Sequence, residues 1–309
     1  EPFADSSQIP TLLVSQLAKK DVTVALSGDG GDELFGGYDR YKMIARLASM
    51  QKILPKKVPS LSGPLLQTLN VERLNKISLL LYKNFTDKNG GQRFGHRVHK
   101  AARSISASDF LEAYFQLITI ADGRSKLVLG AEERKKYKAY RGGLFSSDQF
   151  KSIEGLDAYK KAMLIDTVTY LPNDLLTKVD RASMSVSLEV RTPFLDVSLY
   201  DYAWRVNKSS FYPKVINKWL LKKSLNGLMP EKLIHRPKMG FGVPIGSWLK
   251  DQLKPWASDL LDPHTIRRYG YLDSDEVAKK WNLHLSGKED FSEQIWSILM
   301  FQSWLEDGN

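Results

Sequence analysis

The sequence contains no cysteine among its 309 residues. Disulfide bonds, thiolate zinc sites and a cysteine nucleophile are therefore excluded for this chain, while the redox compartment stays open. No apolar run approaches the roughly 20 residues that a membrane-spanning helix needs. The first residues also lack the basic and apolar segments of a signal peptide. We therefore expect a cytoplasmic protein with no membrane partner.

Composition places the chain among ordinary globular proteins without choosing its partner. Hydrophobic residues make up 42% and charged residues 26%, which is typical of such proteins, and the length allows one large or two smaller domains. The 45 Lys and Arg residues exceed the 35 Asp and Glu residues, giving a net charge of +10. This charge favours anionic partners, and nucleotides, nucleic acids and acidic membranes all fit it.

Strands are scarce in the sequence. Only residues 22–26 form a β-branched run that predicts a short buried strand, whereas most of the chain has helical periodicity. We expect a mainly α fold with a small parallel β remnant, with residues 1–50 as an α/β part and residues 51–309 as a mainly helical region. Because one strand cannot form a sheet, partner strands should come from outside the chain, which we expect to be the later part of a longer protein.

A glycine-rich motif follows that strand. Residues 27–38 read Ser-Gly-Asp-Gly-Gly-Asp-Glu-Leu-Phe-Gly-Gly-Tyr, and a predicted helix covers residues 41–47. Glycines permit positive φ angles and close approach of a ligand to the backbone. The carboxylates of Asp29, Asp32 and Glu33 suit a divalent cation bridging to a phosphate. A tight structural turn is the alternative, which the density of acids and glycines makes less attractive.

Two later segments carry further candidate residues. Residues 171–184 predict a helix that places Asp174, Lys178 and Arg181 on one face, either as surface salt bridges or as the lining of a cleft. Pro172 marks a kink or a helix start, and Asp196 should cap the next helix. In residues 235–244, Lys238 lies among prolines and glycines and could reach a phosphate, or it could be an exposed turn residue.

The remaining signals favour packing or solvent exposure. The aromatic residues between 273 and 304 have helical spacing and few basic residues among them, which indicates a core and not a nucleic-acid platform. The basic stretch 92–103 contains His96 and His99 at a spacing that a metal could use. No third ligand is near in sequence, so an exposed basic face is the better interpretation.

Several motifs together, in order along nearly the whole chain, resemble the synthetase domain of glutamine-hydrolysing asparagine synthetases, an ATP-pyrophosphatase family (adenine nucleotide α-hydrolase-like). The matching stretches are residues 27–38, 171–196 and 236–248 and the aromatic C-terminal helix. The resemblance implies an α/β fold of which this chain holds the later portion. It also implies that ATP and Mg²⁺ bind and that aspartate is converted to β-aspartyl-AMP and pyrophosphate. Ammonia, released from glutamine by an N-terminal glutaminase domain, then displaces AMP to give asparagine.

The resemblance assigns roles to individual residues. Asp32 matches the acid that holds magnesium on the pyrophosphate, and Lys238 matches the lysine that stabilises charge on the α-phosphate and pyrophosphate. Asp29 matches a position, often Glu, thought to deprotonate the attacking ammonia. The nucleotide-site loop is matched by Ser27, Gly28 and Gly30. The residues assigned to the aspartate substrate are Arg181, Glu189 and Arg191.

Two family features are absent from this sequence: the first phosphate loop, Ser-Gly-Gly-x-Asp-Ser-Ser, and the glutaminase domain. We therefore expect the isolated chain to be inactive or very weak. A related enzyme that adenylates another carboxylate, as β-lactam synthetase-like enzymes do, remains open. A non-catalytic basic module that binds polyanions is a further alternative, supported only by residues 92–103. Nucleic acid is not the expected partner, and a homodimer stays possible.

Overall fold

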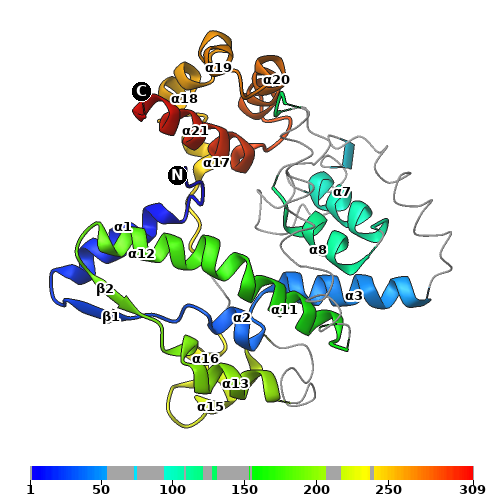
Figure 1. Ribbon diagram of the computed structural model, residues 1–309, viewed down its shortest axis with the longest axis vertical. Helices are drawn as coiled ribbons and strands as arrows, with labels where there is room; N and C mark the ends of the chain where they lie inside the picture. Colours follow the sequence, from blue (N-terminus) through cyan, green and yellow to red (C-terminus); the bar gives the residue numbers. More distant parts are fainter. Residues whose placement is uncertain are drawn as a thin grey trace. The chain divides into compact units, whose positions relative to one another are not determined.

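The computed structural model describes residues 2–53, 73–74, 94–107, 109–120, 127–130, 153, 155–206, 217–236 and 240–308. These residues are mostly helical and contain one two-stranded parallel sheet (Figure 1), which confirms the expected fold class. The chain divides into two compact units, each built from segments distant in sequence. We call residues 5–48 and 150–243 the sheet unit, and residues 1–4, 49–149 and 244–309 the helical unit. The expected division near residue 50 stays a prediction.

The sheet corrects two expectations. Strand β1 (Val24–Leu26) pairs in parallel with β2 (Glu189–Arg191), so a partner strand does lie within this chain. A three-residue strand is too short to produce a periodic signal, which is why β2 was missed. The prediction of a buried first strand is also wrong, since Leu26 is 73% exposed. With only one neighbouring strand, β1 is covered only in part.

The glycine-rich motif forms a short helix that the sequence did not reveal. Helix α2 (Gly31–Phe35) begins after Gly30, with φ of +83°, and ends at Gly36, with φ of +67°. The expected positive φ angles are thereby confirmed at two glycines. Helix α3 (Asp39–Ile53) follows and contains the predicted helical segment.

A long helical path then runs through Pro172. Helix α11 (Ala158–Val168) is capped by Asp157 and leads into a π-helical turn, η1 (Leu171–Leu176), and then into α12 (Thr177–Met184). Because proline lacks an N–H and clashes with the carbonyl four residues back, an irregular turn at this point is expected. Pro172 lies at the start of this irregular turn, in agreement with the predicted kink or helix start. Helix α1 (Gln8–Lys19) lies beside α12 (Figure 1).

Short elements complete the sheet unit. After β2, the 3-10 turn η2 (Pro193–Leu195) leads to α13 (Val197–Arg205). The Asp196 side chain accepts hydrogen bonds from the amides of Ser198 and Leu199, which confirms the predicted cap. Helices α15 (Trp219–Ser224) and α16 (Glu231–Ile234) follow. Helix α15 begins directly after Lys218, which has a φ of +52°.

The helical unit contains a helix pair and a C-terminal group of helices. Helices α7 (Phe94–Ile105) and α8 (Phe110–Ile118) pack together. The C-terminal group comprises α17 (Ile245–Trp248), α18 (Lys254–Leu260), α19 (Pro263–Tyr269), α20 (Ser274–Leu285) and α21 (Ser292–Asp307). Trp281, Trp296 and Leu299 are buried there, which confirms the predicted core at these positions, whereas the prediction is wrong for Trp304, which is exposed. Within the described residues, no helix is both long and apolar enough to span a bilayer.

A buried ion pair joins α3 to α11 within the sheet unit. The Arg40 Nε and Nη2 atoms lie 2.9 and 2.6 Å from Asp166 Oδ2, and the Asp166 side chain is fully buried. The Arg40 guanidinium also lies 3.9 Å from the ring centroid of Tyr38 and 4.7 Å from that of Tyr170. Ion pairing and cation–π contacts therefore meet at one side chain.

We predict that Arg40→Met lowers the free energy of unfolding by about 3 kcal/mol, because it leaves the Asp166 carboxylate buried without its cation. Urea unfolding followed by circular dichroism measures the change. Arg205→Met is the matched control: its pair with Asp201 is exposed, so the loss should stay below about 1 kcal/mol. Adding Asp166→Leu to Arg40→Met should restore much of the stability. Equal losses for the two arginine variants would contradict the prediction.

Candidate active site

The two strands bring distant motif segments to one edge of the sheet. Leu26 pairs with Arg191 at the carboxyl ends of β1 and β2, and the Ser27 amide donates a hydrogen bond of 2.8 Å to the Arg191 carbonyl. The glycine-rich loop and residues 192–195 both leave the sheet here. In open parallel α/β sheets, ligands bind outside this edge.

Ser27 and Asp29 hold the start of the loop. The Ser27 hydroxyl donates to Asp29 Oδ2 at 2.6 Å, and the Asp29 amide donates to Ser27 Oγ at 3.3 Å. Gly28, between them, is exposed and has open space where a side chain would project. A ligand could therefore approach the backbone at Gly28.

Gly30 and Gly31, unlike Gly28, are packed against other side chains. A side chain at Gly30 would overlap that of Leu195, and one at Gly31 would lie 3.2 Å from the Phe194 ring. The glycines let α2 pack closely on the η2 turn. The assignment of Gly30 to the nucleotide site stays a prediction.

Asp32 has a partner that sequence reasoning missed. Its Oδ1 lies 3.0 Å from Lys218 Nζ, and both side chains are partly exposed. The adjacent Asn217 donates to Asp39 Oδ1 at 2.9 Å, and the Lys218 amide donates to the Gly36 carbonyl at 3.3 Å. These contacts bridge more than 170 residues of sequence, so no local pattern in the sequence could have revealed them.

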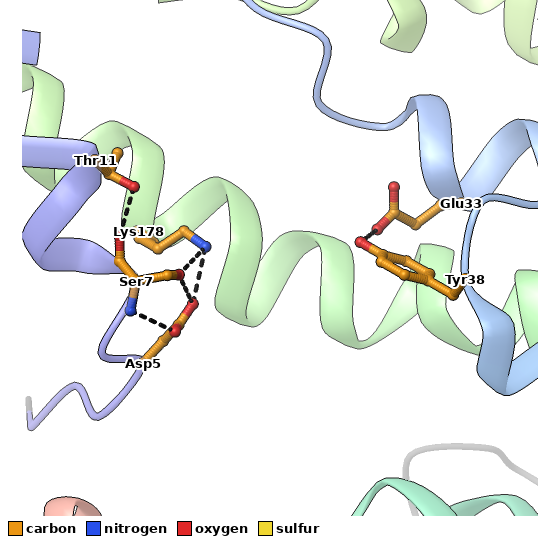
Figure 2. A network of polar contacts seen from close by, with 6 residues as sticks. All are labelled: Asp5, Ser7, Thr11, Glu33, Tyr38 and Lys178. Atoms are coloured by element: carbon orange, nitrogen blue, oxygen red, sulfur yellow. Dashed lines mark hydrogen bonds and ion pairs between the residues drawn. The ribbon is translucent and has the colours of Figure 1, made fainter. Parts of the chain in front are cut away.

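The environment of Glu33 differs from those of Asp29 and Asp32. It is 1% exposed, and Tyr38 donates a hydrogen bond of 2.7 Å to its Oε1 (Figure 2). Burial raises the pKa of Glu33, against the opposing effect of the Tyr38 hydrogen bond, and burial also raises the pKa of Tyr38. Among the described residues, no three His, Asp or Glu side chains converge to hold a metal ion.

Asp32 nevertheless suits a magnesium ion that arrives with a nucleotide. Mg²⁺ at such sites is held by one or two carboxylates together with phosphate oxygens and water, and not by a cage of protein ligands. The partly exposed Asp32 carboxylate meets this requirement, whereas the buried Glu33 does not. The residues present therefore fit phosphate-bridged magnesium.

The structure describes some of the other predicted site residues and not others. Glu189 and Arg191 are exposed on β2, where Arg191 Nε donates to Glu189 Oε1 at 2.7 Å, next to the loop. Arg181 is exposed on α12, and its role in binding aspartate stays a prediction. Lys238 lies outside the described residues, as does the side chain of His96 in the basic stretch.

Comparison with known proteins identifies the family. The asparagine synthase family model matches residues 1–306. The chain belongs to the asparagine synthase family. This confirms the resemblance, and the family's domain has the ATP-pyrophosphatase fold.

Individual relatives agree with this assignment. The chain is 29% identical over 308 residues to "Asparagine synthetase [glutamine-hydrolyzing] 1" of Bacillus subtilis, covering 98% of the chain and 43% of that protein. It is 30% identical over 310 residues to a putative asparagine synthetase [glutamine-hydrolyzing] of Mycobacterium tuberculosis H37Rv, covering 98% of the chain and 42% of that protein. The chain thus spans less than half the length of these relatives.

In this member of the asparagine synthase family, Lys178 on α12 belongs to a largely buried network with Asp5 and Ser7 (Figure 2). Lys178 is 7% exposed, and its Nζ donates to Asp5 Oδ2 at 2.8 Å and to Ser7 Oγ at 2.7 Å. The Ser7 amide and hydroxyl donate to the two Asp5 oxygens. At Lys178, therefore, the polar face of α12 is not a surface salt bridge. It fixes the start of α1 to α12.

Two acids beside Lys178 have pKa values that are shifted in opposite directions. Burial raises the pKa of Asp174 to about 6; the Asp5 charge adds to this effect and Lys178 opposes it. Burial also acts to raise the pKa of Asp5, but hydrogen bonds from Lys178 and Ser7 outweigh it and leave that pKa lowered. One lysine thus compensates mainly one of the two carboxylates.

We predict that Asp174→Asn stabilises the protein at neutral pH. The folded-state pKa of about 6 exceeds the ordinary 3.8, so the free energy of unfolding falls as pH rises between these values. Because Asp174 is partly exposed, we expect a gain of about 1–2 kcal/mol at pH 7.5 and much less at pH 4.5.

Urea unfolding at pH 4.5, 6.0 and 7.5 measures this dependence. Asp180→Asn serves as the control, because Asp180 is exposed on α12, the helix that follows η1, and should change stability by less than about 0.5 kcal/mol throughout. A gain from Asp174→Asn that is independent of pH would show that charge burial is not its cause.

Proposed function

We propose that this chain is the synthetase portion of a glutamine-dependent asparagine synthetase. In this proposal, ATP activates the side-chain carboxylate of aspartate, and ammonia derived from glutamine converts the activated species to asparagine. Family membership and the names of the relatives support the reaction. ATP and Mg²⁺ are the expected cofactors, and the glutaminase domain would belong to the part of the relatives that this chain does not span.

The observation that carries the proposal is the hydrogen bond from the Ser27 amide to the Arg191 carbonyl. It brings the glycine-rich loop and the β2 segment, 164 residues apart in sequence, to the same carboxyl edge of the sheet. The exposed backbone at Gly28 and the partly exposed carboxylate of Asp32 lie on this loop. An anionic, metal-bound nucleotide is the ligand that suits such an edge.

The reaction has two steps. The aspartate carboxylate attacks the α-phosphorus of ATP, forming β-aspartyl-AMP and releasing pyrophosphate. Ammonia then attacks the activated carbonyl, and AMP leaves as asparagine forms. The magnesium ion, when bound, would offset the negative charge of the phosphates.

The chain's own residues take the following roles in the proposal. Asp32 would hold the magnesium ion, and Lys238 would stabilise the charge that develops on the phosphates, a form of electrostatic catalysis. Asp29 would accept a proton from the attacking ammonia, with its carboxylate oriented by the Ser27 hydroxyl.

Further residues would position the substrates. The nucleotide loop is formed by Ser27, Gly28 and Gly30. The aspartate substrate would contact Arg181, Glu189 and Arg191, of which Glu189 and Arg191 already orient one another.

We predict that Lys238→Ala lowers the rate of aspartate-dependent ATP–pyrophosphate exchange about 10²–10³-fold in the full-length protein, because it removes a cation from the developing charge. Lys232→Ala is the matched control, since Lys232 is exposed on α16, and should leave the rate unchanged. Exchange by Lys238→Ala at the wild-type rate would refute the proposed function.

We also predict that the isolated chain shows no exchange or only very weak exchange. Its sequence lacks the Ser-Gly-Gly-x-Asp-Ser-Ser loop, whose backbone amides would supply much of the phosphate contact. The same exchange assay, run on the chain alone and on the full-length protein, tests this expectation. Comparable rates from both would contradict it.

A further inference from the structure

Gly37 occupies a position where space, and not backbone conformation, requires glycine. Its φ is outside the left-handed region, unlike those of Gly30 and Gly36. A Cβ atom added to Gly37 would overlap Asp32 Oδ1 and lie 2.6 Å from Lys218 Cε. The three atoms nearest to this added Cβ thus belong to the two members of one ion pair.

Two hydrogen bonds hold the backbone around Gly37. The Gly37 amide donates to the Asp32 carbonyl at 2.8 Å, and the Tyr159 hydroxyl donates to the Gly36 carbonyl at 2.9 Å. The Asp32–Lys218 pair is partly exposed, and such pairs are weak. An added methyl group would therefore displace the side chains before it displaced the backbone.

Lys218 precedes α15 in a rare backbone conformation. Its φ of +52° is unusual for a residue with a side chain. Its amide is bonded to the Gly36 carbonyl, which fixes the start of α15 beside the end of α2. Backbone and side chain of Lys218 thus both contact the segment that carries Asp32.

We propose that Gly37 is a positioning residue for Asp32: its missing side chain leaves the space in which Lys218 orients the Asp32 carboxylate. The importance of that orientation for catalysis rests on the proposed function, in which Asp32 holds magnesium. The pairing itself does not rest on that function, because it is a contact between two side chains of the folded chain.

The first test measures coupling between Asp32 and Lys218 through stability. Urea unfolding is compared for the wild type, Asp32→Asn, Lys218→Met and the double variant, and the same set is repeated with Gly37→Ala. When Gly37 is present, we expect the effects of the two charge substitutions on stability to be non-additive, by several-fold in the folding equilibrium constant. In the Gly37→Ala background, we expect the two effects to be additive. Coupling that persists with Gly37→Ala would overturn the proposal.

The second test concerns magnesium in the full-length protein. Gly37→Ala should raise the half-saturating Mg²⁺ concentration for ATP–pyrophosphate exchange about tenfold or more, and adding Lys218→Met should raise it no further. Gly155→Ala is the control, because a methyl group there meets open space. An unchanged Mg²⁺ requirement in Gly37→Ala would overturn the positioning role.

The two tests separate the inference from the proposed function. Absence of exchange in the wild-type full-length protein would refute the function, and the stability cycle would still decide whether Gly37 seats the ion pair. If Gly37→Ala fails to fold, Lys218→Met alone must raise the Mg²⁺ requirement. A normal requirement in that variant would overturn the proposal.

Discussion

The pairing of β1 with β2 is the constraint on which the described site depends. Each strand has three residues, and the pairing continues beyond them through the bond from the Ser27 amide to the Arg191 carbonyl. Without this register, the glycine-rich loop and the η2 turn would have no common edge. Gly30 could not then pack against Leu195, and the path of the chain into α2 would be undefined.

Buried charged side chains are a second feature of the sheet unit. Glu33, Asp166 and Lys178 are all buried in the sheet unit, and each has a hydrogen-bonding partner from another part of the motif or another element. Burying such groups without partners costs several kcal/mol, whereas paired groups fix relative positions. The same side chains that weaken a purely apolar core thus join the start of α1 to α12 and α3 to α11, and hold Tyr38 beside α2.

Local signals in the sequence predicted the features that depend on near neighbours. The cap at Asp196, the irregularity at Pro172 and the positive φ angles in the glycine-rich motif each arise from one residue and its adjacent backbone. The buried Trp281 and Trp296 were likewise evident from helical spacing.

The features that escaped prediction join residues distant in sequence. The partner strand β2, the pair between Asp32 and Lys218, and the network of Lys178 with Asp5 need a folded chain before they exist. Residue type alone also gave a wrong prediction of burial for β1. A β-branched composition indicates strand propensity, whereas the burial of a strand depends on how many strands and helices surround that strand. The family motifs predicted which residues form the site, and the contacts among those residues came from the fold.

The π-helical turn at residues 171–176 has a consequence for the phase of the helices. Such a turn accommodates about one residue more than an α-helical turn, so every side chain of α12 is rotated by about 100° from where an unbroken helix would place it. The buried position of Lys178 therefore depends on a turn one step earlier in the chain. Removal of a single residue from this turn would carry the lysine away from Asp5 without altering either residue.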